Sequence, residues 1–479
     1  MTTDVYQILN EKFGYQSFKS GQQEIIEAVL NKEDVIGILP TGMGKSLCYQ
    51  LPGYMMPHPI IIISPLVSLM QDQVEQMKLF GEKKVVAFNS FLLPNEKQQI
   101  LHQLPKYKFI FISPEMFMQP KVLLALKRTE ISLIVADEAH CISQWGYDFR
   151  PDYLRIGEAF HNWDRPPVLA LTATATTQVI DDISRFLHLQ NPSTIIQSLD
   201  RPNIRYKSIF VETVEEKYNK ILNQIQSFEG PGIIYTQSRK KADEYALKLK
   251  DEGFRVASYH AGMEPMDRTL VQQQFGHQEL DWVCATNAFG MGVHKSNIRQ
   301  VIHDHIPSSI ANYSQEVGRA GRDGKDAIAT LFYSNDDEDM TVFISTNDFP
   351  DRSQINLYSK QENPKDLVND GIISETTYRI LSYWLEKYSE AETVQIMENL
   401  RHEKIRQIYL MKDLLTNEQC LRNQLVSFFG QVLSSKPLHC CSVCGINDKE
   451  LLKPMAQQRS KDKKHRWNER LSLIFNREL

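Results

Sequence analysis

The sequence predicts an α/β protein with two parallel-sheet lobes in tandem, followed by a mostly helical subdomain. Two series of short apolar runs alternate with helical patterns, one series before and one after residue 200. Runs that are apolar at every position are typical of parallel strands buried on both faces of a sheet. After about residue 340 these runs stop, and apolar residues recur at helical spacing instead.

The first lobe is expected over residues 1–200. Its strand candidates are short and rich in β-branched residues, and helical patterns separate them. Residues suited to phosphate and metal follow two of these strands, at the edge of the sheet where α/β folds place ligands. The strand candidates are residues 35–39, 60–64, 109–112, 133–136 and 168–171.

The second lobe is expected over residues 201–340, with strand candidates at 232–236, 256–260, 282–286, 300–303 and 328–333. Only the first lobe carries a glycine-rich phosphate loop, so we expect the nucleotide in the cleft between the lobes. Residues 341–450 should form the helical subdomain, and residues 451–479 a basic tail. Within the subdomain, one apolar helix face is predicted at Tyr378, Leu381, Leu385 and Tyr388.

The loop at residues 39–46 carries the strongest functional signal. It reads Leu-Pro-Thr-Gly-Met-Gly-Lys-Ser, with Leu39 where the general pattern has its first glycine. In such loops glycines let backbone N–H groups approach phosphates, the lysine meets the β- and γ-phosphates, and the serine hydroxyl binds Mg²⁺. The residues expected to bind the nucleotide are Thr41, Gly42, Met43, Gly44, Lys45 and Ser46, with Ser46 also a Mg²⁺ ligand.

Two carboxylates follow the apolar run at residues 131–136. Asp137 would hold Mg²⁺, and Glu138 would act as general base on the attacking water. Because the apolar run buries the strand, both carboxylates should be aimed at the phosphate loop. We therefore predict an enzyme that hydrolyses a nucleoside triphosphate.

Two further regions offer side chains to the nucleotide. Tyr15 has an aromatic face for a base, and Gln22 can both donate and accept at an adenine edge. Arg319 and Arg322 lie three residues apart on one face of a helical turn. Their planar, charged guanidinium groups suit the γ-phosphate, which they would reach from the opposite lobe.

The chain resembles a superfamily 2 helicase, and specifically a RecQ-family DNA helicase. Many RNA helicases share the DEAH box, whereas the segment CISQWGYDFRP at residues 141–151 is more specific to RecQ proteins. The matching stretches span roughly residues 10–330 in family order. They are FGYQSFKSGQ, LPTGMGKSLCYQ, ISPLVSLMQDQV, ISPE, DEAHCISQWGYDFRPDY, LTATAT, RPNI, GIIYTQSRK, YHAGM, ATNAFGMGVHKSNIRQVIH and YSQEVGRAGRDG.

The resemblance implies two RecA-like lobes, ATP as the nucleotide, and roles for individual residues. Lys19 would join Tyr15 and Gln22 at the adenine, and Thr172 and Thr174 would couple hydrolysis to DNA movement. At the phosphates, the implied residues are Gln315, Arg319 and Arg322, with Arg322 as the arginine finger.

An aromatic-rich loop after the DEAH box is the implied link between single-stranded DNA and the ATP site. Aromatic faces stack on bases, and a neighbouring arginine can bind phosphate. Aromatic side chains that fill the interface between the lobes are the alternative, and the two roles are compatible. The residues expected to bind DNA are Gln144, Trp145, Phe149 and Arg150.

Four of the seven cysteines lie close together, at Cys420, Cys440, Cys441 and Cys444. In a cytosolic protein such a group is typical of a metal site. RecQ proteins carry a zinc-binding subdomain with one cysteine and a later C-x₂-C-x₂-C run, so the resemblance implies Zn²⁺. Residues 345–395, roughly, look like an insertion relative to the compact form of that subdomain. Leu438 stands at the first position of that run. Cys440 would then complete the site, with His439 or the lack of a stable metal as the alternatives.

Composition sets the remaining expectations. An apolar content of 42% and a charged content of 24% are typical of soluble proteins, and no apolar run approaches a membrane span, so we expect a cytoplasmic protein. The net charge of −5 disfavours nucleic acid only weakly, because residues 453–479 hold eight Lys or Arg against three Asp or Glu. This tail would contact DNA or a partner, or remain solvated.

Together these features predict an ATP-dependent DNA helicase. By resemblance it would move 3′→5′ on single-stranded DNA and unwind forked duplexes in repair, recombination and rescue of replication forks. We expect a monomer, with a single-stranded-DNA-binding protein or other repair proteins as further candidate partners. Only 35 residues follow Cys444, too few for a winged helix or an HRDC domain. The rival functions are an RNA-directed helicase and a DNA-binding adaptor with vestigial hydrolysis.

Overall fold

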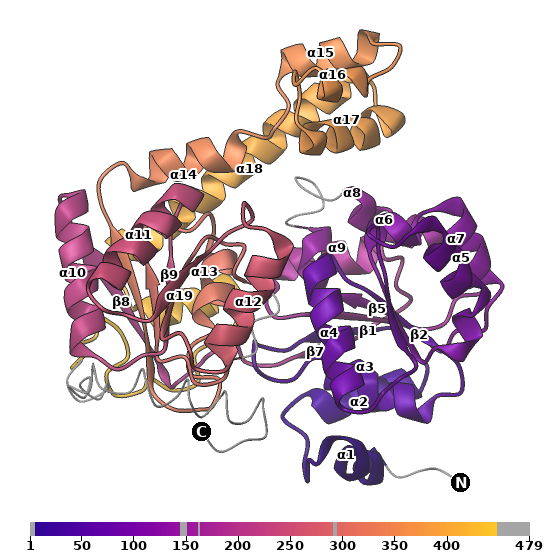
Figure 1. Ribbon diagram of the computed structural model, residues 1–479, viewed down its shortest axis with the longest axis horizontal. Coiled ribbons are helices and arrows are strands. Elements are labelled where there is room, and N and C mark those ends of the chain that lie inside the picture. The colour runs from indigo at the N-terminus through magenta and orange to yellow at the C-terminus, as the bar shows by residue number, and fades with distance from the viewer. Residues whose placement is uncertain (1–4, 144–150, 161–162, 291–294, 448–479) are drawn as a thin grey trace, which may run out of the picture.

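The computed structural model describes residues 5–143, 151–160, 163–290 and 295–447. These residues form two α/β lobes and a helical extension that starts at the second lobe and reaches over to the first (Figure 1). The predicted class, with two parallel sheets followed by helices, is confirmed.

The first lobe contains a seven-stranded sheet with the order β3-β4-β2-β5-β6-β1-β7, and all neighbouring strands in it are parallel. The second strand consists of four buried isoleucines, as a strand covered on both faces requires. The strands are β1 Val35–Ile38, β2 Ile60–Ile63, β3 Val85–Phe88, β4 Phe109–Ile112, β5 Leu133–Asp137, β6 Val168–Thr172 and β7 Ser193–Ile196.

Helices cover both faces of this sheet. Ile61 and Ile63 belong to one apolar cluster and Ile60 and Ile62 to another, because successive side chains of a strand point to opposite faces. The helices are α1 Val5–Phe13, α2 Gln22–Leu30, α3 Leu47–Met55, α4 Val67–Leu79, α5 Pro94–His102, α6 Pro114–Phe117, α7 Pro120–Lys127, α8 Pro151–Leu154 and α9 Thr177–Phe186, with 3-10 helices at Leu104–Lys106, Ala139–Ile142 and Ile156–Phe160.

The second lobe contains a six-stranded parallel sheet with the order β10-β11-β9-β12-β13-β8. Thr213, Ser238 and Ser309 cap three of its helices by accepting a backbone N–H of the first turn. The elements are β8 Ile204–Phe210, α10 Val214–Ser227, β9 Gly232–Tyr235, α11 Arg239–Asp251, β10 Val256–Tyr259, α12 Pro265–Gly276, β11 Trp282–Ala285, β12 Gln300–His303, α13 Ile310–Val317 and β13 Ala327–Tyr333.

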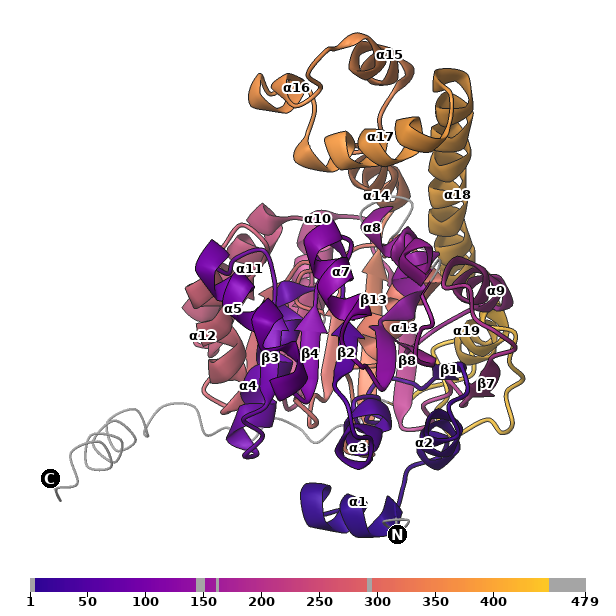
Figure 2. The same cartoon turned by 90° about the vertical axis from the view of Figure 1, so that its right-hand side faces the viewer.

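The helical extension consists of an arm, formed by α14 and α18, and a small module, formed by α15, α16 and α17 (Figure 1). α18 has 27 residues and is therefore about 40 Å long; it runs from the second lobe to the module (Figure 2). α14 packs along it, and α17 contacts α8 of the first lobe. The elements are α14 Asp337–Thr346, α15 Arg352–Lys360, α16 Asp366–Asn369, α17 Glu375–Lys387, α18 Glu390–Thr416 and α19 Leu421–Phe428.

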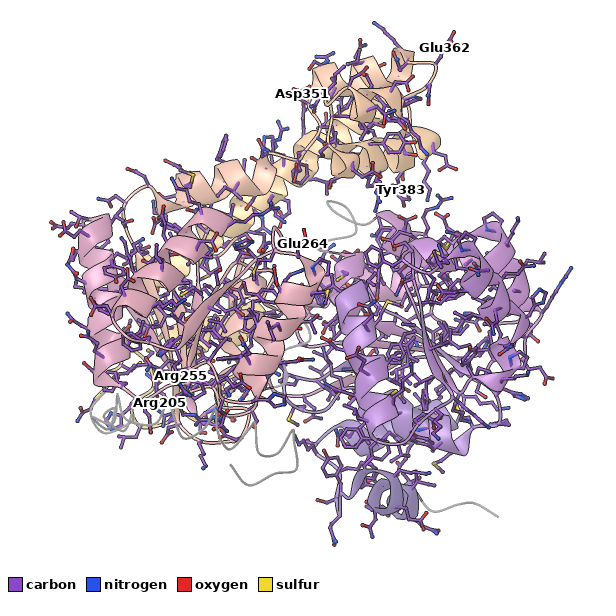
Figure 3. The ribbon with its side chains drawn as sticks, viewed as in Figure 1. Arg205, Arg255, Glu264, Asp351, Glu362 and Tyr383 are labelled. Carbon is purple, nitrogen blue, oxygen red and sulfur yellow. The ribbon has the colours of Figure 1, made fainter. Side chains whose placement is uncertain are left out.

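Burial holds the module against the first lobe. Tyr383 points from α17 toward that lobe (Figure 3), and it belongs with Trp384 to the same apolar cluster as Tyr153 of α8. Lys387 pairs with Glu158 at the edge of this contact. The apolar face predicted for α17 is therefore wrong in part, because Leu381 is buried whereas Tyr388 is 42% exposed.

Three strands escaped the sequence analysis: β3, β7 and β8. All three lie at an edge of their sheet. Edge strands are covered less completely, and β7 and β8 expose side chains along their length. A search for strands that are apolar throughout therefore finds the centre of each sheet and misses three of the four edge strands; β10 is the edge strand that it found.

Candidate active site

The phosphate loop joins β1 to α3 at the carboxyl edge of the first sheet. Gly42 and Gly44 have φ values of 86° and 77°, a region that favours glycine. A Cβ on Gly42 would lie 3.1 Å from Cγ of Arg322, and a Cβ on Gly318 would lie 2.3 Å from Oγ1 of Thr41. Glycine at these positions thus allows the loop to approach the second lobe closely.

Asp137 and Glu138 meet Lys45 at this loop. Asp137 ends β5, and Glu138 follows with φ of 51°, a conformation that is uncommon for non-glycine residues and concentrates at functional sites. Lys45 Nζ donates to Glu138 Oε1 at 2.9 Å. The sequence predicted this convergence, which places a cation and two carboxylates at the end of one strand.

The two adjacent carboxylates have different proton affinities. Burial, and then the negative charge of Glu138, raises the pKa of Asp137 to about 6. Burial alone would also raise the pKa of Glu138, but Lys45 and His140 outweigh it and hold that pKa below its ordinary value. Glu138 is therefore the stronger acid of the pair. Neighbouring carboxyl groups whose pKa values are pushed apart are typical of acid–base sites.

His140 connects the carboxylates to the second lobe. Its Nδ1 lies 3.3 Å from Glu138 Oε2 and 2.9 Å from Thr172 Oγ1. Its Nε2 lies 3.2 Å from Nε2 of Gln315, which also donates to Thr174 Oγ1 at 3.2 Å. One buried imidazole thus contacts the general-base candidate, the end of β6 and α13 of the second lobe.

Arg319 and Arg322 follow α13 and face the phosphate loop from the second lobe. Arg319 is buried, with 6% of its surface exposed. Burial, together with the positive charges of Arg319 and Arg201, lowers the pKa of Arg322 to about 9. A phosphate in this place would offset the crowded positive charge, since guanidinium groups bind phosphate oxygens through paired donors.

The segment before α2 packs against the back of the phosphate loop. Lys19 Nζ donates to Gly42 O at 2.8 Å, and Gln22 Nε2 donates to Met43 O at 2.7 Å and Gly44 O at 3.1 Å. Gln22 Oε1 accepts from Lys19 N at 2.8 Å. Tyr15 is 58% exposed. Gln22 therefore stabilises the loop in the structure, and contact of these residues with adenine stays a prediction.

The predicted DNA-binding residues Gln144, Trp145, Phe149 and Arg150 lie outside the described residues. The chain on either side of them is well anchored. Ser143 Oγ donates to Asp182 at 2.7 Å on one side. On the other side, Tyr153 of α8 is buried and donates to the carbonyl of Asp137. One flank of the segment thus contacts α9, and the other contacts the end of β5, which carries Asp137.

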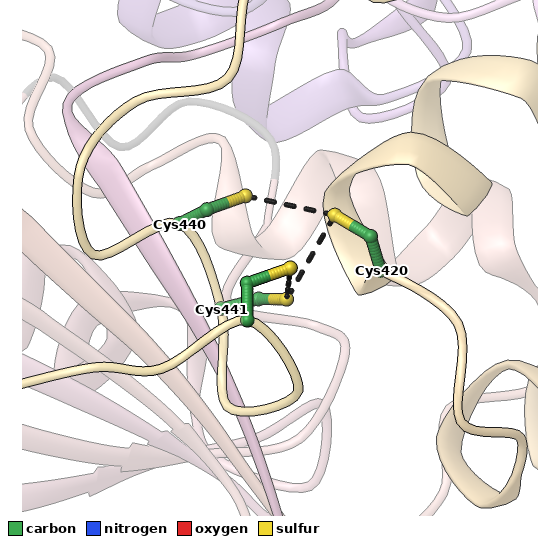
Figure 4. Close-up of side chains that lie close together, drawn as sticks. Cys420, Cys440 and Cys441 are labelled. Carbon is green, nitrogen blue, oxygen red and sulfur yellow. Dashed lines mark hydrogen bonds between the residues drawn. The ribbon is translucent and has the colours of Figure 1, made fainter.

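The four cysteines of the helical subdomain converge beside β8 (Figure 4). Sγ of Cys420 lies 3.6 Å from that of Cys440 and 3.9 Å from that of Cys441, and Cys441 lies 3.4 Å from Cys444. Four thiolates about 2.3 Å from a tetrahedral zinc would lie about 3.8 Å apart, so the donor set fits Zn²⁺. Cys440 belongs to this group, as preferred over His439.

His140 and Arg201 are the two residues of the site that the sequence analysis did not single out. Arg201 lies in the connection between the lobes and donates to carbonyls of both. The available signals were the DEAH box for His140 and the RPNI stretch for Arg201.

Two family models match the chain. A DEAD/DEAH box helicase model matches residues 19–183, and a helicase conserved C-terminal domain model matches residues 216–324. The two matches fall on the two lobes. No described helix is long and apolar enough to cross a membrane.

Similar proteins extend these matches over nearly the whole chain. The probable ATP-dependent DNA helicase RecS of Bacillus subtilis is 40% identical, covering 99% of this chain and 98% of that protein. The ATP-dependent DNA helicase RecQ of Haemophilus influenzae is 44% identical over 68% of this chain, which spans 52% of that protein's length. Among solved structures, the DUF1998 helicase MrfA bound to DNA has a TM-score of 0.59 at 16% identity, covering 76% of this chain and 55% of that one.

Proposed function

The chain belongs to the RecQ family of ATP-dependent DNA helicases, and from this premise we propose that it moves 3′→5′ along single-stranded DNA and unwinds forked duplexes. We further propose that it acts as a monomer in DNA repair, recombination and rescue of replication forks. The observation that carries the proposal is the meeting of Lys45 and Glu138 of one lobe with Arg322 of the other.

Hydrolysis would take place between these groups. Mg²⁺, held by Ser46 and Asp137, would supply charge neutralisation at the phosphates. Lys45 would bind the β- and γ-phosphates and so exchange its pairing with Glu138 for one with the nucleotide. Glu138 would then orient and deprotonate the attacking water, while Arg322 would stabilise the charge that develops on the transferred phosphoryl group.

Movement would follow from the contacts between the lobes. Gln315 and Thr41 reach across to the opposite lobe at hydrogen-bonding distance. Loss of the γ-phosphate removes the anion that Arg322 binds, so the lobes can part after hydrolysis. The segment with Trp145 and Arg150, which comes after the 3-10 helix that follows β5, would make this cycle sensitive to single-stranded DNA.

The cysteine cluster would hold Zn²⁺ as a closed structural site. Zn²⁺ bound by Cys420, Cys440, Cys441 and Cys444 would supply a cross-link between the start of α19 and residues 440–444. Tyr206 of β8 accepts from Ser442 N at 2.9 Å, so this cross-link is joined to the second sheet. Its role would be to fix the subdomain and not to react.

ATP hydrolysis should be measured without nucleic acid, with single-stranded DNA and with RNA, beside strand separation on forked duplexes with 3′ or 5′ tails. We expect stimulation by DNA, and separation only with the 3′ tail. Stimulation without separation would indicate a translocase. Stimulation by RNA alone would favour an RNA helicase, and an active Glu138→Gln variant in cells would favour an adaptor.

A further inference from the structure

Arg201 joins the two lobes at the back of the ATP site. It lies in the connection between β7 and β8, and its guanidinium group donates to four backbone carbonyls. One belongs to the phosphate loop and three to the turn that follows α13. They are Thr41 O at 3.3 Å and Gly318 O at 3.1 Å from Nη1, and Ala320 O at 3.0 Å and Gly321 O at 2.8 Å from Nη2.

The three carbonyls of the second lobe lie in residues 318–322, which carry Arg319 and Arg322 and are called the arginine turn here. Arg319 lies between the first and second of the three carbonyls of the second lobe, and Arg322 directly follows the third. A guanidinium group that binds all three fixes the course of the turn, and hence the direction in which both arginine side chains leave it. Lysine offers a compact ammonium and cannot span four acceptors in one plane.

A second arginine fixes the chain that carries Arg201. Arg422 of α19 is fully buried, and its guanidinium group lies 5.0 Å from the ring centroid of Tyr206. Its Nη1 donates to Asp200 Oδ1 at 2.6 Å and to Arg201 O at 2.8 Å, and it also binds the carbonyl of Ile204. Its Nε donates to Cys440 Sγ at 3.3 Å.

The contacts thus run without a break from the cysteine cluster to the ATP site. Cys440 contacts Arg422, Arg422 contacts the backbone around Arg201, and Arg201 contacts the phosphate loop and the arginine turn. Every member of this series is held by hydrogen bonds to groups that are buried or partly buried. Displacement of the cluster would therefore move the connection between the lobes, and with it the arginine turn.

We propose that Arg201 is a positioning residue for ATP hydrolysis, which orients Arg319 and Arg322, and that Arg422 makes this orientation depend on the cysteine cluster. This inference rests on the proposed function, since it concerns the same hydrolysis. It assigns to the cluster an effect on turnover in addition to its effect on folding.

The first test is Arg201→Lys in the full chain, assayed for DNA-stimulated ATP hydrolysis and for binding of a fluorescent nucleotide. Because the arginine turn is misplaced while the phosphate loop persists, we expect kcat to fall about tenfold to a hundredfold, the scale of a misplaced catalytic group. KM and nucleotide affinity should change by less than about threefold, because the lost interaction acts mainly in the transition state.

Arg205→Gln is the matched control. Arg205 lies four residues further along and binds Asp326 at 3.3 Å and the carbonyl of Pro202, both within the second lobe. Its kcat should stay near that of the wild type. An unchanged kcat in Arg201→Lys would overturn the inference, as would a loss that appears only in KM. A wild-type protein without DNA-stimulated hydrolysis would instead overturn the proposed function.

The second test concerns Arg422→Lys and the double variant with Arg201→Lys. If Arg422 acts through Arg201, the double variant loses no more kcat than Arg201→Lys alone, because the two changes share one route. If the fold-loss of kcat in the double variant equals the product of the losses in the two single variants, the two arginines act independently and the proposed coupling is overturned. Zinc content and thermal midpoint are measured on each variant. If Arg422→Lys loses zinc or unfolds, Asp200→Asn is used in its place, because it removes the carboxylate that Arg422 binds and keeps both arginines. Its double variant with Arg201→Lys should then lose no more kcat than Arg201→Lys alone, and losses that multiply would again overturn the coupling.

Discussion

Lys45 Nζ lies 2.9 Å from Glu138 Oε1, so the cation of the phosphate loop and the proposed general base form an ion pair. Both side chains are about 85% buried, with 15% and 14% of their surfaces exposed. Each group thus holds the other at the site, and the approach of a phosphate would draw Lys45 away and leave Glu138 free to accept a proton. The pair would therefore link nucleotide binding to activation of the proposed base.

Glu138→Gln is expected to lower kcat about 10²- to 10⁴-fold, the range of general base catalysis, while nucleotide binding persists. Glutamine keeps the shape but cannot take the proton. The rate of ATP hydrolysis and the affinity for a fluorescent nucleotide are measured, and we expect the first to fall while the second stays the same. A kcat close to that of the wild type would contradict the role of Glu138, and Glu158→Gln, at the contact with the helical module, serves as the control.

Asp34 should make the first lobe sensitive to acid. Burial alone would raise its pKa, but Arg165 and the backbone N–H groups of Gln190 and Val168 outweigh burial and lower it. Arg165 binds it through two nitrogens, at 2.9 and 2.6 Å. Because the folded-state pKa lies below the unfolded value of about 3.9, the stabilisation is complete above that value and is lost as pH falls through the folded-state pKa.

Asp34→Asn is therefore expected to cost about 2–4 kcal/mol near neutral pH, since it leaves a buried arginine without its counter-charge. Urea midpoints of both proteins between pH 3 and pH 7 check this. The difference between them should shrink as pH falls below 4. A constant difference would show that the charge of Asp34 is not the cause, and Asp326→Asn, at a half-exposed ion pair, should change little at any pH.

Loss of the Zn²⁺ that we propose for the cysteine cluster should loosen the helical subdomain. Cys441→Ser removes one of the four proposed zinc ligands. Because the backbone of Cys441 pairs with Tyr206 of β8, loss of zinc here should also loosen the contact with the second sheet. We therefore expect less bound zinc and a lower thermal midpoint. Bound zinc and the midpoint are measured together, before and after a chelator. Cys48→Ala, in α3 of the first lobe, should keep its zinc. Full zinc content in Cys441→Ser would exclude this cysteine as a ligand.

The helical module should be held to the first lobe by burial and not by charge. Trp384 is 6% exposed within the cluster shared with that lobe, so Trp384→Ala is expected to cost about 3–5 kcal/mol. Lys387→Ala removes a partly exposed ion pair with Glu158 and should cost less than about 1 kcal/mol. Unfolding in urea, followed by circular dichroism, compares the two. A larger effect of Lys387→Ala would contradict this account.

The fold could be predicted where burial on both faces makes a strand apolar at every position of the sequence. β2 is apolar throughout because helices cover both of its faces, whereas β8 at a sheet edge exposes part of its length and gave no such signal. The face of α17 was predicted only in part for a related reason. Leu381, Tyr383 and Trp384 all belong to one apolar cluster with first-lobe residues, so the buried surface of α17 is wider than one stripe.

The closeness of the phosphate loop, the DEAH carboxylates and the second-lobe arginines could be predicted, because each of these residue types has one dominant chemistry in such motifs; their roles toward ATP stay predictions. Lys45, Glu138 and Arg322 are separated by 93 to 277 residues in the chain, yet phosphate chemistry alone indicates that they meet. Arg201 could not be found in this way, because its partners are backbone carbonyls, which every residue carries. Only the course of the chain shows that four of them surround one guanidinium group.

The central claim is that ATP is hydrolysed between the lobes, and turnover of Arg322→Ala with saturating single-stranded DNA tests it most directly. An arginine supplied across a cleft contributes about 10³- to 10⁵-fold to turnover, so kcat should fall by at least about 10³-fold while nucleotide binding to the first lobe persists. Turnover within about tenfold of the wild type would contradict a site shared by the two lobes, since a tenfold change is only about 1.4 kcal/mol of barrier.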